Sequence, residues 1–189
     1  MRYPAHETAE KHRRILGEAS RLFRERGFID VSVGEIMKAT GLTHGPFYNH
    51  FASKQDLVCE SITAESDRAI AELLECPPTE EARDAYIEGY LSTAHCEAPG
   101  MGCLMASLAA EVAREPDTKP AFTKHMQALI SRFSSHFPWR RSSPARSEAI
   151  HTLAAMVGGM VLARASDDPD LAEEILGEVR KHLYERQSR

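Results

Sequence analysis

The chain has 189 residues and a mass of 21.0 kDa, with 42% hydrophobic and 27% charged residues. A chain of this size and composition can bury a core without disulfides or metals. It has no apolar run long enough to cross a membrane, and its polar N-terminus argues against a secretory signal. We therefore expect a cytoplasmic protein whose four cysteines, none of them in a CxxC pair, are reduced thiols.

The charge is distributed unevenly along the chain. The net charge of −5 divides into +3 over residues 1–54 and −8 over the remaining 135 residues. A basic N-terminal segment on an acidic body suggests an anionic partner for that segment. Chance remains the alternative, because the excess of three positive charges is modest.

Helical periodicity runs through nearly the whole sequence, and no convincing period-two run is present. The first helix is expected from about Thr8 to Arg26, with Gly27 ending it. The second begins at a capping box, in which Ser32 and Glu35 cap each other, and ends before Gly41.

A third helix is expected to follow at once, with Thr43 as its N-cap and Pro46 in its first turn. A fourth is expected from Ser53, its N-cap, to about Glu75. The remaining helices are expected at about 79–96, 102–115, 118–137, 144–166 and 169–187, with Ser143 and Asp168 as N-caps of the last two. The predicted fold class is therefore all-α, with about nine helices.

The second and third helices, joined by a short turn that contains Gly41, have the layout of a helix-turn-helix motif. The stretch Val33–Leu57, and above all THGPFYNHFASK at 43–54, resembles the TetR/AcrR family of bacterial transcription regulators. The family pattern there is a hydroxyl residue, Gly two positions later, then Tyr, His-Phe and Ser-Lys at fixed spacing. Pro46 departs from it, since the family more often has Thr or Ser at that position.

The resemblance implies a DNA-binding domain at residues 1–53 and a ligand-binding and dimerisation domain at residues 54–189. Hydroxyl and ammonium groups are expected to bind phosphates of double-stranded DNA, and these are Ser32, Thr43, Tyr48 and Lys54. Short polar residues at the start of the third helix are expected to reach base edges, and these are His44, Gly45 and Asn49.

The resemblance also implies a homodimer formed by the last two helices, which would place two recognition helices on a near-palindromic operator. The candidate interface residues form apolar stripes on these helices: Leu153, Val157, Gly158, Val161, Ile175 and Val179. Paired glycines within a helix favour close approach of another helix. The alternative is that these stripes pack only inside one subunit.

A small-molecule inducer is expected to bind among the helices of the body. The apolar candidates for the pocket are Tyr90, Cys103, Met105, Leu108, Phe122, Met126 and Phe133, and the polar candidates are His95, Glu111 and His125. Most such apolar stripes are core packing, so only some of these residues are expected to line a pocket.

Cys103 receives two interpretations. Near a helix N-terminus a thiol is more nucleophilic, which would allow the protein to respond to a reactive electrophile. The alternative is a small buried apolar residue, which is the commoner role. A metal site built from His95, Cys96 and Cys103 is disfavoured, because their spacing matches no known ligand pattern.

The sequence thus predicts a ligand-responsive DNA-binding regulator, most simply a repressor released from its operator by a small molecule. The alternative is a DNA-binding protein on the same fold whose output is a protein partner, and such a protein would need no cavity. No nucleophile elbow, phosphate-binding loop, dinucleotide fingerprint or HExxH motif is present, so no enzyme activity, cofactor or metal is expected.

Overall fold

The structure is a computed structural model that describes residues 5–43, 45–140 and 143–188. Over these residues it is all-α, as predicted, with no strand. The α-helices are α1 (Ala5–Arg26), α2 (Val33–Ala39), α3 (Lys54–Glu75), α4 (Glu80–Tyr90), α5 (Thr93–Glu97), α6 (Leu104–Val112), α7 (Lys119–His136), α8 (Ala145–Ala165) and α9 (Pro169–Ser188). Three 3₁₀ turns accompany them, η1 (Gly45–Asn49), η2 (Pro99–Met101) and η3 (Pro116–Thr118).

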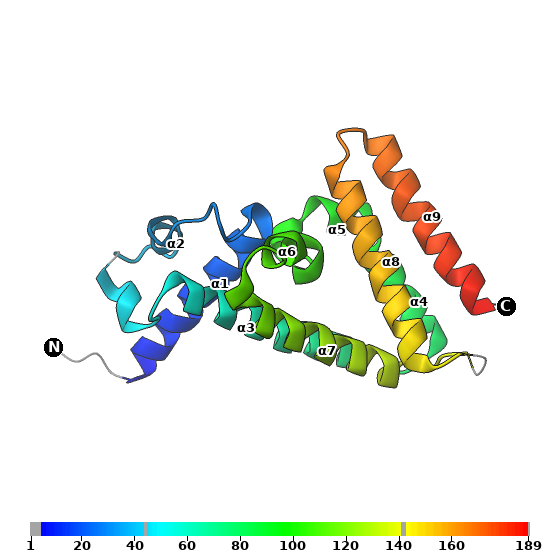
Figure 1. Cartoon of the computed structure of the whole chain (residues 1–189), viewed down its shortest axis with the longest axis horizontal. Helices are drawn as coiled ribbons and strands as arrows, with labels where there is room; N and C mark the ends of the chain where they lie inside the picture. The colour runs from blue at the N-terminus through cyan, green and yellow to red at the C-terminus, as the bar shows by residue number, and fades with distance from the viewer. Residues whose placement is uncertain (1–4, 44, 141–142, 189) are drawn as a thin grey trace.

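The molecule is elongated (Figure 1), with α1, α2 and η1 at one end and the antiparallel pair α8 and α9 at the other. Helices α3 and α7 lie side by side between the two ends. One large apolar cluster extends from Ile15 in α1 to Leu153 in α8, and a smaller one joins α4, α8 and α9. The larger cluster therefore extends from the α1 end of the molecule as far as α8.

The predicted helix starts depend on side chains that satisfy free N–H groups, and the structure shows three of them. Ser32 and Glu35 form the reciprocal capping box at α2. Ser53 accepts the N–H of Asp56 at the start of α3, and Asp168 accepts the N–H groups of Asp170 and Leu171 at α9. Ser143 was expected to cap α8, but Pro144 occupies the cap position and makes no side-chain hydrogen bond there.

The third predicted helix is wrong in type. Residues 45–49 form a 3₁₀ turn, in which the Phe47 carbonyl accepts the N–H groups of His50 and Phe51 at its end. Pro46 donates no hydrogen bond and disfavours the α conformation in the residue before it, which limits helix growth here.

The helix predicted at 79–96 is two helices, α4 and α5, because Ser92 interrupts it. Ser92 adopts an extended backbone, accepts the N–H of His95 and donates to the carbonyl of Gly89. Serine competes in this way with the helical hydrogen bonds, so a helix ends and another begins at it. Across the part of the chain that the structure describes, no helix combines the length and hydrophobicity that a membrane crossing needs.

Candidate DNA-binding face and ligand cavity

The helix-turn-helix end is held together by a small apolar core. Ile36 and Met37 from α2 are buried with Phe47 and Phe51 from the η1 region. His12 of α1 stacks on the Phe51 ring, with 4.4 Å between ring centroids. This packing fixes one side of η1 and turns its other side toward solvent.

The candidate DNA-contacting residues lie on that outer side. Ser32, Thr43 and Asn49 are exposed, and Tyr48 is 66% exposed. His44 lies outside the described residues, and only the backbone of Gly45 is described. An exposed phenol on a rigid turn is positioned to reach a partner from solvent.

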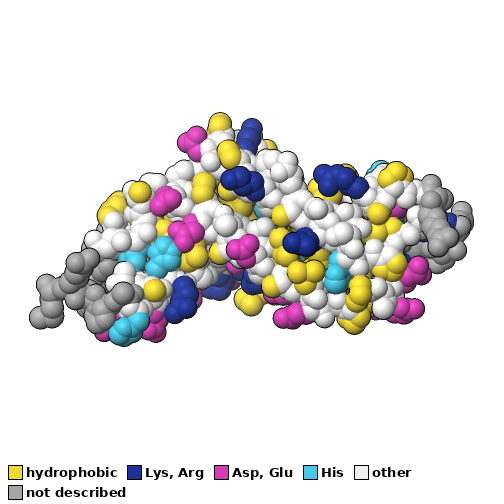
Figure 2. All heavy atoms as spheres, turned by 90° about the horizontal axis from the view of Figure 1, so that it is seen from below, with side chains coloured by type: hydrophobic (Ala, Val, Ile, Leu, Met, Phe, Trp, Pro, Cys, Tyr) yellow, Lys and Arg dark blue, Asp and Glu magenta, His cyan; other side chains and the backbone are white. Residues whose placement is uncertain are grey.

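Lys54 is placed differently from the expectation of a free phosphate ligand. Its Nζ donates to the carbonyl of Ile29 at 3.0 Å, in the turn between α1 and α2. A DNA phosphate would therefore have to bind the Lys54 ammonium group alongside this carbonyl or displace the carbonyl from it. On the face shown in Figure 2, basic and acidic side chains are interspersed. The positive charge of the N-terminal segment therefore forms no continuous basic patch on this face.

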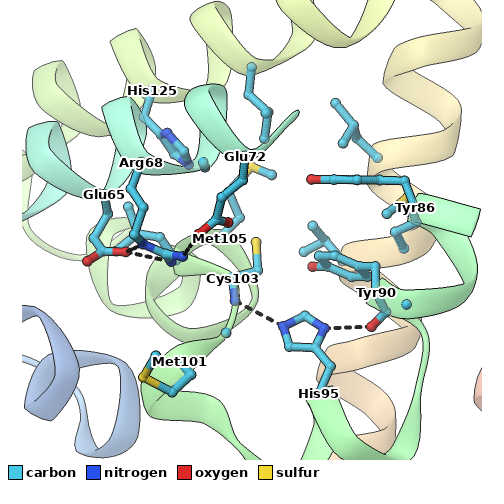
Figure 3. Close-up of a pocket in the computed structure, with 18 of the residues that line it drawn as sticks. Glu65, Arg68, Glu72, Tyr86, Tyr90, His95, Met101, Cys103, Met105 and His125 are labelled. Carbon is cyan, nitrogen blue, oxygen red and sulfur yellow. Dashed lines mark hydrogen bonds and ion pairs between the residues drawn. The ribbon is translucent and has the colours of Figure 1, made fainter. Parts of the chain in front are cut away.

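A cavity of about 340 Å³ lies between α3, α4, α6, α7 and α8. Figure 3 shows the hydroxyl ends of Tyr86 and Tyr90 directed from α4 toward a wall formed by Glu65, Arg68 and Glu72 of α3. The volume falls at the small end of the range typical of ligand sites, roughly 300–1,000 Å³.

Three of the predicted pocket residues line this cavity: Tyr90, Cys103 and Met105. The other four belong to the surrounding core instead, namely Leu108, Phe122, Met126 and Phe133. Of the polar candidates, His95 and His125 line the cavity, but Glu111 does not. The helical period identifies an apolar face correctly, but it does not separate side chains that fill the core from side chains that border an empty space.

His95 organises the side of the cavity next to Cys103. Its Nδ1 hydrogen-bonds the carbonyl of Tyr90 at 2.5 Å, and its Nε2 accepts the backbone N–H of Cys103 at 3.1 Å. With Nε2 as an acceptor, Nδ1 carries the proton of a neutral ring, and burial lowers the His95 pKa, consistent with that form. Cys103 is the N-cap residue of α6, so His95 satisfies the N–H at that helix start.

Sequence reasoning missed the charged wall of the cavity. Glu65 is buried and pairs with Arg24 of α1 at 2.5 Å and with Arg68 at 2.8 Å, and Arg68 also pairs with Glu72 at 2.5 Å. A signal was present, because Glu65 falls in the same four-residue register as Leu57 and Ser61 on the buried side of α3.

The candidate dimer residues divide into two groups. Leu153 and Val157 point inward, where they line the cavity, and Val179 packs against Gly159 within the chain. An added Cβ at Gly159 would lie 3.2 Å from Val179, so the close helix approach suggested by the paired glycines occurs inside the subunit.

The outer faces of α8 and α9 carry the second group. Val161 is exposed, and Gly158 and Ile175 are partly exposed. An added Cβ at Gly158 would meet nothing within 4 Å. Other large apolar side chains exposed on these helices are Ile150, Leu162 and Leu171.

The cysteines do not converge on a metal site. All four are free thiols, and Cys96 lines a separate cleft from the cavity that Cys103 lines. Among the described residues, no group of three or more His, Cys, Asp or Glu side chains could hold a metal ion.

Comparison with known proteins identifies the family. Residues 15–60 match the family model of bacterial regulatory proteins of the tetR family. The E. coli transcriptional regulator UidR is 32% identical to this chain over 120 residues. The chain belongs to the TetR/AcrR family.

Structures of TetR-family proteins support this over the full fold. A TetR-family regulator from Agrobacterium tumefaciens superimposes with a TM-score of 0.76 and 26% identity, covering 95% of this chain and 98% of that one. E. coli NemR in its reduced form has the same fold, with a TM-score of 0.76 and 21% identity over 92% of this chain and 95% of its own.

The family model covers the DNA-binding end of this chain, at residues 15–60. The aligned segment of UidR is 64% of this chain and 60% of UidR. The family model contains the candidate DNA residues but ends before the cavity wall at Glu65. These relatives are transcriptional regulators rather than enzymes, in agreement with the lack of catalytic motifs in the sequence.

Proposed function

We propose that this protein is a ligand-responsive transcription regulator, most simply a repressor, that a small molecule releases from a near-palindromic operator. Residues 1–53 would bind DNA, and residues 54–189 would bind the ligand and form a homodimer. The helix-turn-helix match and the cavity in the body support the two halves of this proposal.

The observation that carries the proposal is the continuity of α3. This helix begins at Lys54, beside the turn of the helix-turn-helix end, and three turns later forms the cavity wall at Glu65, Arg68 and Glu72. Its 22 residues span about 33 Å. A ligand that favours a different position of this wall would shift the DNA-binding end with it, provided it binds that form more tightly.

The DNA contacts are assigned by chemistry and exposure. Thr43 and Tyr48 would donate hydroxyl hydrogen bonds to phosphates, and Lys54 would contribute positive charge. The Ser32 hydroxyl donates to the Glu35 carboxylate at 2.8 Å and would exchange this partner for a phosphate. Asn49 can pair with an adenine edge through its amide, and Gly45 would let the backbone approach the groove closely. His44, which lies outside the described residues, completes the proposed set because it is a polar residue beside Gly45 in the sequence.

Selection of bound sequences from random DNA, followed by fluorescence anisotropy at two salt concentrations, tests this assignment. Asn49→Ala should weaken binding to the selected site by about 1–3 kcal/mol relative to binding to random DNA. Lys54→Ala should weaken binding to the selected site and to random DNA equally. It should also reduce the slope of log affinity against log salt concentration by roughly 0.9. Lys181→Ala, on the distant α9, is the matched control, and lack of any sequence preference at either salt concentration contradicts the proposal.

A homodimer through the outer faces of α8 and α9 would cover their exposed apolar side chains. On α8 Leu162 is 60% exposed and Val161 43% exposed, and Leu171 and the partly exposed Ile175 extend this apolar surface onto α9. Two helices from each subunit would then form a four-helix interface under two-fold symmetry. Gly158, which is open within one chain, would accept a side chain of the partner.

Sedimentation equilibrium tests the interface. Leu162→Arg should convert dimers to monomers, because an arginine in the apolar centre would lose its hydration without a counter-charge. Leu74→Arg introduces the same change at an exposed leucine on α3 and should leave the dimer intact. Equal dimerisation of both variants would place the interface elsewhere.

The inducer would act in the cavity, and a reactive electrophile would act through Cys103. This thiol stands at the start of α6 and borders the cavity. At Cys59, burial and the neighbouring Asp56 and Asp117 raise the pKa of the thiol and so reduce its thiolate fraction.

Iodoacetamide provides a direct probe, since the sulfur forms a thioether, iodide leaves and the thiol proton passes to water. Mass spectrometry should find Cys103 modified before Cys59, and the modification should release bound DNA. Cys103→Ser should abolish this release, whereas Cys59→Ser should preserve it. If iodoacetamide still releases DNA from the Cys103→Ser protein, Cys103 has only a packing role.

A regulator with a protein partner as its output remains the second candidate from the sequence. The cavity of about 340 Å³ favours the small-molecule candidate, because a purely protein-responsive regulator needs no such space.

A further inference from the structure

The cavity leaves specific polar atoms without hydrogen bonds. Both ring nitrogens of His125, a residue only 2% exposed, have no hydrogen-bond partner, and neither has the buried hydroxyl of Tyr90. Buried polar groups are nearly always paired in folded proteins, so such atoms facing a cavity indicate a missing partner. His125 comes from α7 and Tyr90 from α4, on different sides of the space.

The charged groups around the cavity are, in contrast, already paired. Glu65 pairs with Arg24 and Arg68, and Arg68 also pairs with Glu72. These two acidic and two basic side chains neutralise one another. A charged ligand would lose its hydration on binding and would find no unpaired counter-ion along this wall.

The unpaired groups are themselves neutral. Burial lowers the His125 pKa, so the ring is uncharged at neutral pH with one donor and one acceptor nitrogen. Burial raises the pKa values of Tyr86 and Tyr90, which keeps both phenols protonated. The cavity therefore offers neutral hydrogen-bonding groups, and its Tyr90 hydroxyl is a donor.

The remaining lining is apolar and includes aromatic rings and sulfur. The rings of Tyr86 and Tyr90 border the space, and the other apolar lining residues are Leu104, Met105, Leu129, Leu153, Met156 and Val157. Aromatic rings and thioethers both make favourable contacts with a planar aromatic molecule.

We infer that the cavity binds an uncharged aromatic molecule that carries a hydroxyl or carbonyl oxygen, held by hydrogen bonds to Tyr90 and His125. This inference rests on the proposed ligand-responsive function and specifies its ligand class. The Tyr90 hydroxyl donates to the ligand oxygen, and His125 accepts from or donates to a polar group on the other side.

Four probes on one ring system test the class by isothermal titration calorimetry at pH 7. They share the naphthalene ring and differ in the substituent at position 2. They are 2-naphthol (neutral hydroxyl), 2-methylnaphthalene (apolar), 2-naphthoate (anion) and 2-naphthylmethylammonium (cation). We expect 2-naphthol to bind most tightly, by about tenfold over the two ions, because the ions are desolvated without a counter-ion. Tighter binding of 2-naphthoate would assign the anchor to Arg68 and overturn the inference.

Variants then assign the anchor. Tyr90→Phe should weaken 2-naphthol binding by about three- to tenfold, the loss expected for one hydrogen bond. His125→Leu should remove the similar gain in affinity that a second hydroxyl on the opposite ring, in naphthalene-2,6-diol, provides over 2-naphthol. Both substitutions should leave 2-methylnaphthalene binding unchanged, which also verifies that the variants fold. Tyr184→Phe is the control, because the Tyr184 hydroxyl donates a hydrogen bond to the Asp84 carbonyl outside the cavity. Equal affinity of 2-naphthol and 2-methylnaphthalene, or binding of none of the four probes, would overturn the inference.

DNA binding measured on the same samples separates this inference from the proposed function. Sequence-specific DNA binding without binding of 2-naphthol would refute the ligand class and leave the DNA-binding regulator in place. Binding of 2-naphthol that depends on Tyr90, without sequence-specific DNA binding, would support the ligand class and refute the regulator.

Discussion

The Glu111 carboxylate of α6 accepts hydrogen bonds from the backbone N–H groups of Phe28, at 2.8 Å, and Ile29, at 3.2 Å. These two N–H groups lie in the turn between α1 and α2. At the other end of α6, Cys103 borders the cavity. A nine-residue helix thus connects the cavity directly to the turn that precedes α2.

A second contact lies beside it. The guanidinium group of Arg24 in α1 donates from Nε to the carbonyl of Gly100 in η2 at 2.9 Å and also pairs with Glu65. An added Cβ at Gly100 would lie 2.3 Å from the Glu25 carboxylate, so a glycine permits this close approach. The DNA-binding end is therefore held by polar contacts at α3, α6 and η2.

Glu111→Ala should lower the free energy of unfolding by about 1–3 kcal/mol, because it leaves two backbone donors without their acceptor. Glu111→Gln retains one carbonyl oxygen as acceptor and should lose less. Urea denaturation monitored by circular dichroism measures both changes. The exposed Glu174→Gln on α9 is the control, and an unchanged stability of Glu111→Ala would show that water replaces the carboxylate without cost.

Gly27→Ala should destabilise the fold by about 1–2 kcal/mol, the cost of a Cβ in the left-handed region, since Gly27 has φ +80°. The added Cβ would also lie 2.4 Å from Glu111 Oε1 and displace that carboxylate. The loss should therefore be smaller in a Glu111→Ala background, in which no side chain has to be displaced, as a double-mutant cycle would measure.

Gly17→Ala is the matched glycine control for this substitution. Gly17 lies on the exposed side of α1, and an added Cβ would meet nothing within 4 Å. This change should stabilise the helix by roughly 0.5–1 kcal/mol. Destabilisation of both variants by similar amounts would contradict a special role for the Gly27 turn.

The fold should gain stability as the pH rises through the ordinary titration range of histidine. Burial lowers the pKa of His125 below 6.5, so the unfolded chain binds a proton that the folded chain does not. The resulting loss of folding stability is present below about pH 6.5 and disappears above it. His125→Leu should flatten the rise in unfolding free energy between pH 5 and 8 (rough bounds of that range), whereas a slope equal to that of the unsubstituted protein would place His125 in contact with water.

Glu35 should stabilise the chain at neutral pH and lose this effect in acid. The backbone N–H of Ser32 and the Arg26 guanidinium, both at 2.8 Å, lower the Glu35 pKa from 4.5 to about 2. A lowered folded-state pKa gives stability that is complete above pH 4.5 and is lost as the pH falls toward 2. The stability difference between the unsubstituted protein and Glu35→Gln should therefore shrink below pH 4.5, and a constant difference would show that Glu35 acts only by packing.

Local signals in the sequence determined where most helices begin and end. Ser32, Ser53 and Asp168 each cap a helix by accepting an N–H two or three residues later, and Gly27 ends α1 with a positive φ. These interactions involve neighbours in the chain, so residue types and spacing suffice to predict them. The helix-turn-helix pattern was identified on the same basis.

The orientation of α8 was decided only by the tertiary structure. This helix has apolar residues around most of its circumference, so its period did not show which side faces inward. Leu153 and Val157, expected at a dimer interface, line the cavity, whereas Val161 faces solvent. Packing against α7 on one side and α9 on another selected these directions.

The polar contacts that join the two ends of the molecule also came only from the tertiary structure. Glu111 reaches Phe28 across 83 positions of sequence, and Arg24 reaches Gly100 across 76. No pattern of neighbouring residues encodes such pairs, because their partners meet only after the helices pack. The sequence by itself determined most of the helices and the DNA-binding motif, and the packing of those helices determined the cavity and its neutral hydrogen-bonding groups.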